Sequence, residues 1–241
     1  MAKTSSSPPP YAPPPNASQS PPTGIPSNFQ RVIQRNPIRG TFIISPELQV
    51  PEELLGLRDQ CSDGGPKNLY LEATKKEVDV DIWTVKAEPR MSVWPMLELE
   101  LVDLVKAVVT VRSFGGWSET PNKLRLHVGS GTSCALTVNS TSQDIHLALP
   151  SNLVGPITLN VRSNRVYFSE SVRMRLVTFS EKDGQRQGFL GDAAKEGYTT
   201  RDAWLGSSLD VTLQSTGSLY LFALGEECPP AEPGGGGCIV G

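Results

Sequence analysis

The chain has 241 residues, of which 38% are apolar, and a net charge of −3. This length is enough for one domain with a sizeable core. No run of Lys and Arg marks a surface for nucleic acid, and no apolar run reaches the roughly 20 residues that cross a bilayer as a helix. We therefore expect neither a nucleic-acid partner nor a membrane-spanning helix.

The composition of residues 1–35 predicts a disordered tail, because Pro, Ser and Thr dominate most of it and leave little to bury. Within it, Pro8, Pro9, Pro10 and Tyr11 form the PPxY pattern that WW domains bind. The alternative is a Pro-rich tail that contains one Tyr by chance. The start of the chain lacks the apolar stretch of a signal peptide, so we expect a cytoplasmic protein with WW-domain proteins as candidate partners.

Four stretches repeat one pattern, in which two alternating apolar runs flank a polar break; they are 69–82, 136–149, 157–169 and 209–221. This alternation is the period of a strand with one buried face, and the Ser, Thr, Asn and Gly residues at the breaks favour tight turns. Each strand–turn–strand unit needs neighbours to cover its apolar face. We expect an all-β domain at residues 36–224, built either as a solenoid-like β-roll of repeats or as a two-sheet β-sandwich.

Further strands are expected at 40–44, around 109–111 and at 124–128, and the stretch 97–107 fits either a strand or a short helix. Residues 51–55 suggest one helical turn that begins with a proline. The dipeptide Asp183-Gly184 lies between two apolar runs and predicts a hairpin.

The alternation also predicts which side chains share the core. Leu147, Leu159, Val166 and Phe168 fall on one phase, so Phe168→Ala should cost about 3–5 kcal/mol. His146 falls on the opposite phase, and its replacement by Ala should change stability by less than about 0.5 kcal/mol.

Few residues offer chemistry. His127 and His146 occupy the polar phase of their strands, so we expect both on the surface. Asp79 and Asp81 share one strand face, where two carboxylates can act as acid and base or bind calcium, although a solvated polar face is the simpler interpretation. Ser133 resembles the serine of a nucleophile elbow but lacks the second Gly and the strand-to-helix turn.

The four cysteines form no CxxC pair, which argues against a zinc site. We therefore predict a protein that is not an enzyme, with no catalytic, cofactor-binding or metal-binding residues and no cofactor.

Residues 225–241 read as a flexible Gly-rich tail that ends in Cys238, Ile239, Val240 and Gly241. A Cys, two aliphatic residues and a final residue is the spacing that prenyltransferases recognise. A terminal Gly is unusual for that motif, so an unmodified tail is the alternative. A lipid at Cys238 would make the protein a peripheral membrane protein, since one lipid chain gives reversible binding.

The stretches 146–168 and 178–192 resemble a known family. They contain in order Leu149-Pro150, Gly155-Pro156-Ile157, Ser163-Asn164-Arg165, Phe179-Ser180-Glu181 and Phe189-Leu190-Gly191-Asp192. This run resembles a fungal domain-of-unknown-function family, number 7330, with Arg165 where the family usually has Gly. The resemblance extends over most of residues 36–224. It implies a β-rich domain similar to adhesin-like β-roll repeats, with no established activity.

Three functional hypotheses follow. The leading one is a non-catalytic intracellular binding or scaffolding module, tethered to membranes if Cys238 carries a lipid. The second is an adhesin-like surface or cell-wall protein, which only the resemblance implies. The third is a hydrolase that uses Ser133 or the pair Asp79 and Asp81.

Overall fold

The computed structural model describes residues 20–48, 67–86, 106–114 and 120–230. One sheet of the described structure has eight strands, which run across the sheet in the order β1 (Gln30–Gln34), β3 (Leu69–Thr74), β5 (Lys106–Phe114), β7 (Ser133–Ser140), β13 (Ser208–Leu213), β9 (Gly155–Val161), β12 (Gln185–Leu190) and β11 (Leu176–Lys182). The other has six, in the order β10 (Val166–Phe168), β14 (Leu219–Ala223), β8 (Ile145–Leu149), β6 (Asn122–Val128), β4 (Val78–Thr84) and β2 (Ile38–Ile44). One short helix, α1 (Glu170–Arg175), follows β10.

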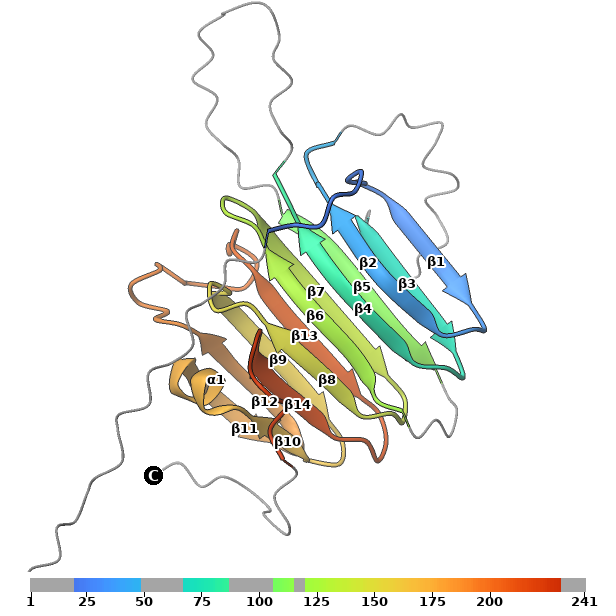
Figure 1. Cartoon of the computed structure of the whole chain (residues 1–241). Helices are drawn as coiled ribbons and strands as arrows, with labels where there is room; N and C mark the ends of the chain where they lie inside the picture. The colour runs from blue at the N-terminus through green and yellow to red at the C-terminus, as the bar shows by residue number, and fades with distance from the viewer. Residues whose placement is uncertain (1–19, 49–66, 87–105, 115–119, 231–241) are drawn as a thin grey trace, which may run out of the picture.

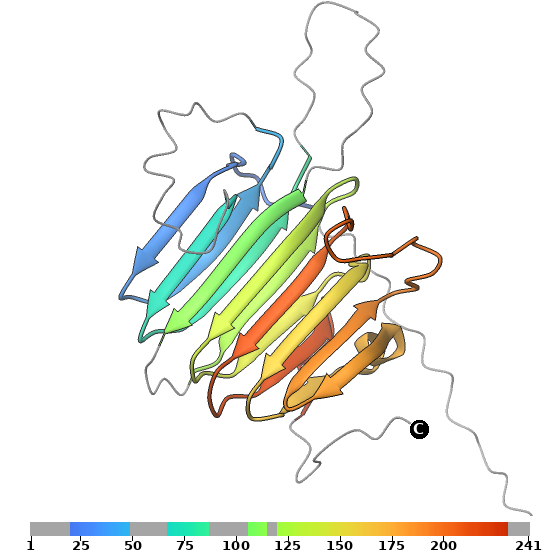
Figure 2. The same cartoon turned by 180° about the vertical axis from the view of Figure 1, so that it is seen from behind.

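From β1 to β10, and again from β13 to β14, the chain alternates between the two sheets, so that each strand–turn–strand unit places one strand in each sheet (Figures 1 and 2). Successive units stack as coils, and neighbouring strands of the coils are parallel. In the described structure, antiparallel pairing is confined to β11 with β12 and β12 with β9. The molecule is thus the repeat-built β-roll, and all four predicted units are confirmed as the coils β3–β4, β7–β8, β9–β10 and β13–β14.

Between the sheets lies the core, in which equivalent residues of successive coils form rows. One row of the six-stranded sheet contains Val80, Leu124, Leu147 and Leu221, which are paired in register and at most 1% exposed. Each such side chain contributes roughly 1.5–3 kcal/mol by leaving water. Since a single coil cannot cover its own apolar face, the coils are stable only as a stack.

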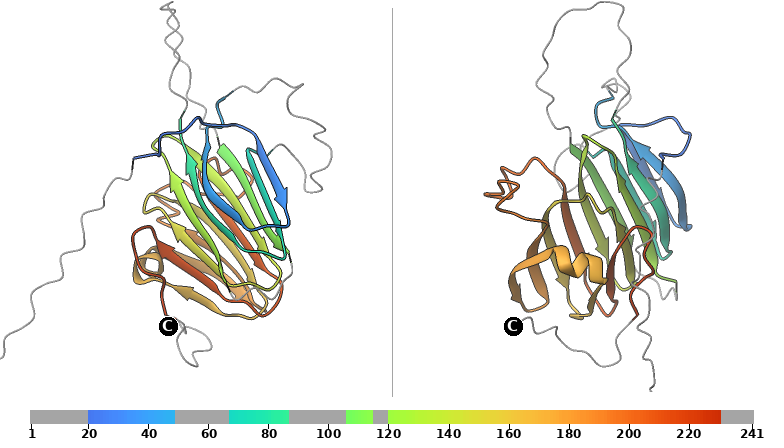
Figure 3. Two further views of the ribbon diagram at one scale, coloured as in Figure 1. Left: turned by 45° about the vertical axis from the view of Figure 1, so that its right-hand side comes forward. Right: turned by 60° about the vertical axis from the view of Figure 1, so that its left-hand side comes forward.

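The first four coils stack in the order of the sequence, but the last two do not. The coil β13–β14 is the last in the chain, yet β13 lies between β7 and β9, and β14 lies between β8 and β10. Because of this insertion, the short strand β10 is the last strand of the six-stranded sheet. The hairpin β11–β12 extends the other sheet two strands further, and Figure 3 shows α1 beside it at this end of the roll.

Turns at the ends of the strands explain two details of the sequence. Asp183 and Gly184 have φ angles of 51° and 78°, so the predicted hairpin is confirmed with both turn residues in the left-handed region. In the turn after β9, the residue with positive φ is Asn164, at 55°. Asn tolerates this conformation well, and Arg165, which stands where the resemblance led us to expect Gly, has no positive φ.

Two expectations about the fold are wrong. Gln30–Gln34 form strand β1, which pairs with β3, although they lie in the stretch 1–35 that was predicted to be disordered. Val166 and Phe168 are only partly buried, since β10 is an edge strand, whereas Leu147 and Leu159 lie fully in the core. The expected cost of 3–5 kcal/mol for Phe168→Ala is therefore too high. The helical turn expected at 51–55 lies outside the described residues. The same holds for residues 97–105 of the stretch 97–107, for which a strand or a short helix was expected.

Candidate functional site

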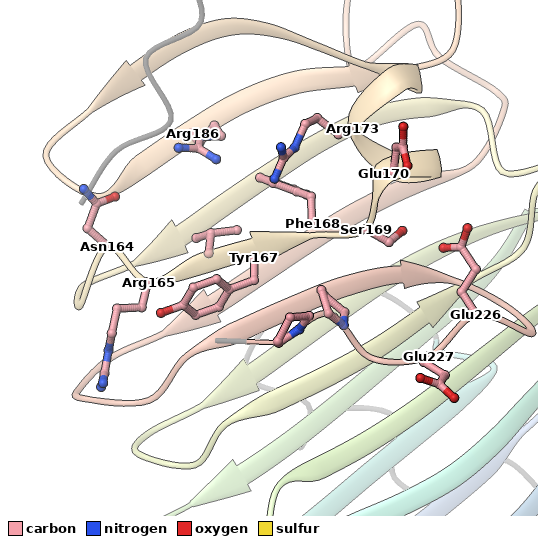
Figure 4. A pocket seen from close by; sticks show the side chains of 13 residues that line it. Asn164, Arg165, Tyr167, Phe168, Ser169, Glu170, Arg173, Arg186, Glu226 and Glu227 are labelled. Atoms are coloured by element: carbon pink, nitrogen blue, oxygen red, sulfur yellow. The ribbon is translucent and has the colours of Figure 1, made fainter. Parts of the chain in front are cut away.

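At the end of the roll where the six-stranded sheet stops at β10, the two sheets differ in width. The helix α1 fills part of the resulting step, with Val172 buried against the core. A cavity of about 370 Å³ is left open beside β10 (Figure 4). We call this cavity the β10 groove; its walls are β10 itself, Arg173 of α1, Arg186 of β12, and four residues near the end of the described chain, Glu226, Glu227, Pro229 and Pro230.

One wall of the groove is an open strand edge. The amide of Leu219 donates to the carbonyl of Arg165 at 2.9 Å, and the amide of Ser169 donates to the carbonyl of Leu221 at 2.9 Å. Because backbone groups alternate sides along a strand, Arg165, Tyr167 and Ser169 direct their ladder groups toward β14. The N–H and C=O groups of Val166 and Phe168 therefore point into the groove, and no described strand pairs with them.

Aromatic side chains give the groove a firm apolar surface. Phe168 packs against the core, and the guanidinium carbon of Arg186 lies 5.4 Å from the centre of its ring. On the outer face, the ring of Tyr167 stacks on Tyr220 with centroids 4.9 Å apart and an angle of 20°. Such contacts hold the rings in place before any ligand arrives.

Most charges in the groove are divided by sign, and Arg173 of α1 lies between the two groups (Figure 4). Figure 4 shows Asn164, Arg165 and Arg186 at the end where β10 begins, and Glu170, Glu226 and Glu227 at the end where β10 leads into α1. Arg186 Nη2 donates a hydrogen bond to the carboxylate of Glu181 at 2.6 Å.

Glu226 is held in its ionised form. Its Oε2 accepts hydrogen bonds from Ser171 Oγ at 2.8 Å and from the Ala223 amide at 3.1 Å. Partial burial opposes ionisation, but the hydrogen bonds from Ser169, Ser171 and Ala223 outweigh it and keep the pKa of Glu226 below its usual value. This end of the groove is thus fixed as negative.

The predicted carboxylate pair forms ion pairs on the outer face of the six-stranded sheet, away from the groove. Arg125 of the neighbouring strand places Nη2 2.9 Å from Asp79 Oδ1 and Nε 2.7 Å from Asp81 Oδ1. Burial raises the pKa of Asp81, but the hydrogen bond and charge of Arg125 lower it more, so the net shift is downward. Both carboxylates are thus bound by a fixed cation. Among the residues that the structure describes, no group of three or more His, Cys, Asp or Glu could hold a metal ion.

The expectation that His127 lies on the surface is wrong. It is 7% exposed, because Trp83 of the adjacent coil, paired with it in register, stacks on its ring at 3.8 Å with an angle of 4°. Burial lowers the pKa of His127, and the nearby Asp81 only partly opposes this shift. His146 is half-buried, with its ring 4.7 Å from Tyr220 and Nδ1 3.6 Å from Cys228 Sγ.

Ser133 is also placed differently from a catalytic serine. It begins strand β7, is 2% exposed, and donates a hydrogen bond from Oγ to the Leu205 carbonyl at 3.1 Å. The adjacent Cys134 is fully buried, and desolvation raises the pKa of its thiol to about 12. The thiol of Cys134 is thus enclosed in the core, whereas Ser133 also lines a second cavity of about 580 Å³.

Two predicted sites, the PPxY motif with Pro8, Pro9, Pro10 and Tyr11 and the lipidation site Cys238, lie outside the described residues. In the described stretches, no helix has both the length and the apolar character to cross a membrane.

Comparison with known proteins gives one relationship. No curated protein and no solved structure matches the chain significantly. The family model described as Domain of unknown function (DUF7330) matches residues 28–226, which include every strand of both sheets and α1. The chain therefore belongs to the DUF7330 family.

Proposed function

We propose that this protein is a non-catalytic binding module that takes up an extended peptide segment in the β10 groove. The observation that carries the proposal is the open edge of β10, where Val166 and Phe168 direct their backbone groups into a cavity. An extended peptide bound there would add a strand to the six-stranded sheet. Strand addition of this kind is a recurrent mode of peptide recognition, in which backbone hydrogen bonds supply affinity and side-chain pockets supply specificity.

The dimensions of the groove suit such a ligand. Its volume of about 370 Å³ falls in the usual range for ligand pockets, roughly 300–1,000 Å³. The outward N–H and C=O groups of two residues offer two donors and two acceptors, and each hydrogen bond contributes about 0.5–1.5 kcal/mol net. The ring of Phe168 supplies apolar surface beside them. These contributions together fit a ligand of a few residues that binds with modest affinity.

The other edge of the six-stranded sheet, at the opposite end of the roll, is built differently. There the edge strand β2 is already in contact with another segment, since Ser27 donates its amide to the Ile43 carbonyl at 2.9 Å and accepts from the Ser45 amide at 3.1 Å. Natural proteins protect strand edges against unwanted pairing. The β10 edge instead borders a cavity with fixed aromatic and charged walls, which favours specific occupation.

A pair of proline substitutions tests the proposal. Val166→Pro removes an amide that faces the groove but leaves the ladder to β14, which uses the Tyr167 amide; prolines are tolerated at such edge positions. Ile33→Pro is the matched control, because Ile33 is also β-branched and its amide also faces away from its single partner strand, at the other end of the roll.

The probe is a display library of random ten-residue peptides selected on the wild-type protein. We expect the enriched peptides to bind Val166→Pro at least about ten-fold more weakly and Ile33→Pro with unchanged affinity, both variants retaining the wild-type circular dichroism spectrum. Failure to enrich any peptide, or equal binding to Val166→Pro and the wild type, would show that the edge of β10 is not a peptide site.

A further inference from the structure

Opposite charges lie at the two ends of the β10 groove, and this arrangement bears on which peptides it accepts. The inference drawn from it rests on the function proposed above. Three features of the groove decide which peptides fit: the cations at its start, the carboxylates at its end, and the length of strand between them.

Cations at the start of the groove have capacity for a ligand. Arg165 forms no ion pair with a residue that the structure describes. Arg186 pairs with Glu181, but this contact uses only one of its five N–H donors. Its side chain is 13% exposed and lies over Phe168, so its charge is less screened than that of an arginine in open solvent. A guanidinium in this position prefers a carboxylate, which it can hold with two parallel hydrogen bonds.

The carboxylates at the other end are separate from Arg165 and Arg186, with Arg173 of α1 lying between the two groups (Figure 4). Glu226 is oriented by Ser171 and the Ala223 amide and is kept ionised by these hydrogen bonds. Glu170 and Glu227 are exposed, and neither forms an ion pair in the described part of the chain. A basic side chain of a ligand would meet three carboxylates here, whereas an acidic one would be repelled.

The geometry points to an extended peptide partner that carries an acidic side chain over the start of β10 and a basic side chain over its end. Arg165 and Glu170 are five positions apart, so at about 3.3 Å per residue the two charged positions of the peptide are separated by roughly four to five residues. Between these two charged positions, the peptide residues that face inward should be apolar, because they would lie beside Val166 and Phe168. The partner is thus a short acid–apolar–base segment of another protein.

Two synthetic peptides distinguish this charge order from simple strand addition. One is a peptide enriched on the wild-type protein, and the other has its acidic and basic residues exchanged. Binding of both is measured by fluorescence anisotropy to the wild type, to the double variant Arg165→Glu with Glu227→Lys, and to the control double variant Arg162→Glu with Glu196→Lys. Arg162 and Glu196 are exposed and lie outside the groove.

We expect the exchanged peptide to bind the wild type about ten-fold more weakly than the original, since two attractive contacts become repulsive. The double variant of the groove should reverse this preference, and the control variant should keep it. Equal binding of the two peptides to the wild type, or a preference that the groove variant leaves unchanged, would refute the charge order.

The outcomes separate this inference from the proposed function. If both peptides lose affinity on Val166→Pro but show no charge order, strand addition stands and the inference fails. If neither peptide responds to Val166→Pro, the proposed function itself fails. Sedimentation of the wild type at the assay concentration gives a third outcome: self-association that the peptide reverses would assign the groove to a second copy of this chain and overturn the inference.

Discussion

Replacing Leu221 by Ala should destabilise the protein more than replacing the larger Phe168, and this order tests how the coils are stacked. Leu221 is 1% exposed and lies in register between Leu147 on one side and Phe168 on the other, because β14 is inserted between β8 and β10. Phe168 has a neighbouring coil on one side only and is partly exposed. If the coils followed the order of the sequence, Phe168 would be central and Leu221 terminal.

The expected magnitudes follow from these environments. A fully enclosed leucine costs about 2–5 kcal/mol when truncated to Ala, so we expect about 3–4 kcal/mol for Leu221→Ala. The same truncation of a fully buried phenylalanine costs about 3–5 kcal/mol, and since Phe168 keeps part of its surface in contact with water we expect about 1–2 kcal/mol.

Urea denaturation followed by circular dichroism measures both free energies of unfolding. For a chain of this size, the loss at Leu221 corresponds to a fall of roughly 6–16 °C in Tm. A greater loss at Phe168 than at Leu221 would refute the inserted position of β13–β14.

Three other predictions concern single residues. Burial lowers the pKa of His127 below its ordinary value of 6.5, so this imidazole binds a proton more readily in the unfolded chain than in the folded one. The contribution of His127 to stability is therefore fully present above pH 6.5 and is lost as the pH falls through the lower pKa of the folded state. His127→Phe, which retains a ring against Trp83, should lose less stability between pH 7 and pH 5 than the wild type in urea titrations at each pH; equal losses would contradict the assignment. Tyr11→Ala should abolish recovery of the protein on immobilised WW domains, and undiminished recovery would remove the PPxY hypothesis. Cys238→Ser should release a membrane-bound fraction of the tagged protein into the cytosol, whereas identical fractionation of variant and wild type, with an unmodified C-terminal peptide by mass spectrometry, would refute lipidation.

Local features of the fold could be predicted from the sequence because they depend on neighbouring residues. Alternation in 157–169 and 209–221 defines which side chains face inward, and the dipeptide Asp183-Gly184 defines a turn. The alternation could not distinguish a roll from a sandwich, because half-buried strands in either architecture have the same period. Only the pairing of the strands distinguishes the two.

The stacking order could not be predicted in this way. Leu209, Val211 and Leu213 of β13 present the same inward pattern as Ile157, Leu159 and Val161 of β9, so nothing in the alternation decides which coil lies next to β7. The β10 groove exists only because β13–β14 occupies that place. Its location therefore could not be found before the register was known.

The burial of His127 was missed for a related reason. Its outward phase was correct, but an outward residue is covered when a large ring occupies the paired position of the adjacent coil, as Trp83 does. The relevant signal was present, since Trp83-Thr84 and His127-Val128 occupy equivalent positions at the ends of β4 and β6. It becomes informative only after the two strands are recognised as neighbours. The ion pairs of Arg125 with Asp79 and Asp81 follow from the same pairing.

Amide hydrogen exchange along β10, measured by NMR with and without a selected peptide, tests the central claim most directly. In the free protein, Tyr167 should exchange slowly because its amide bonds to β14, while Val166 and Phe168 on either side of it should exchange quickly. Bound peptide should slow exchange at Val166 and Phe168 by at least about ten-fold and leave Tyr167 almost unchanged. Slow exchange at all three amides of the free protein, or no added protection with peptide, would contradict the claim that the open edge of β10 is the binding surface.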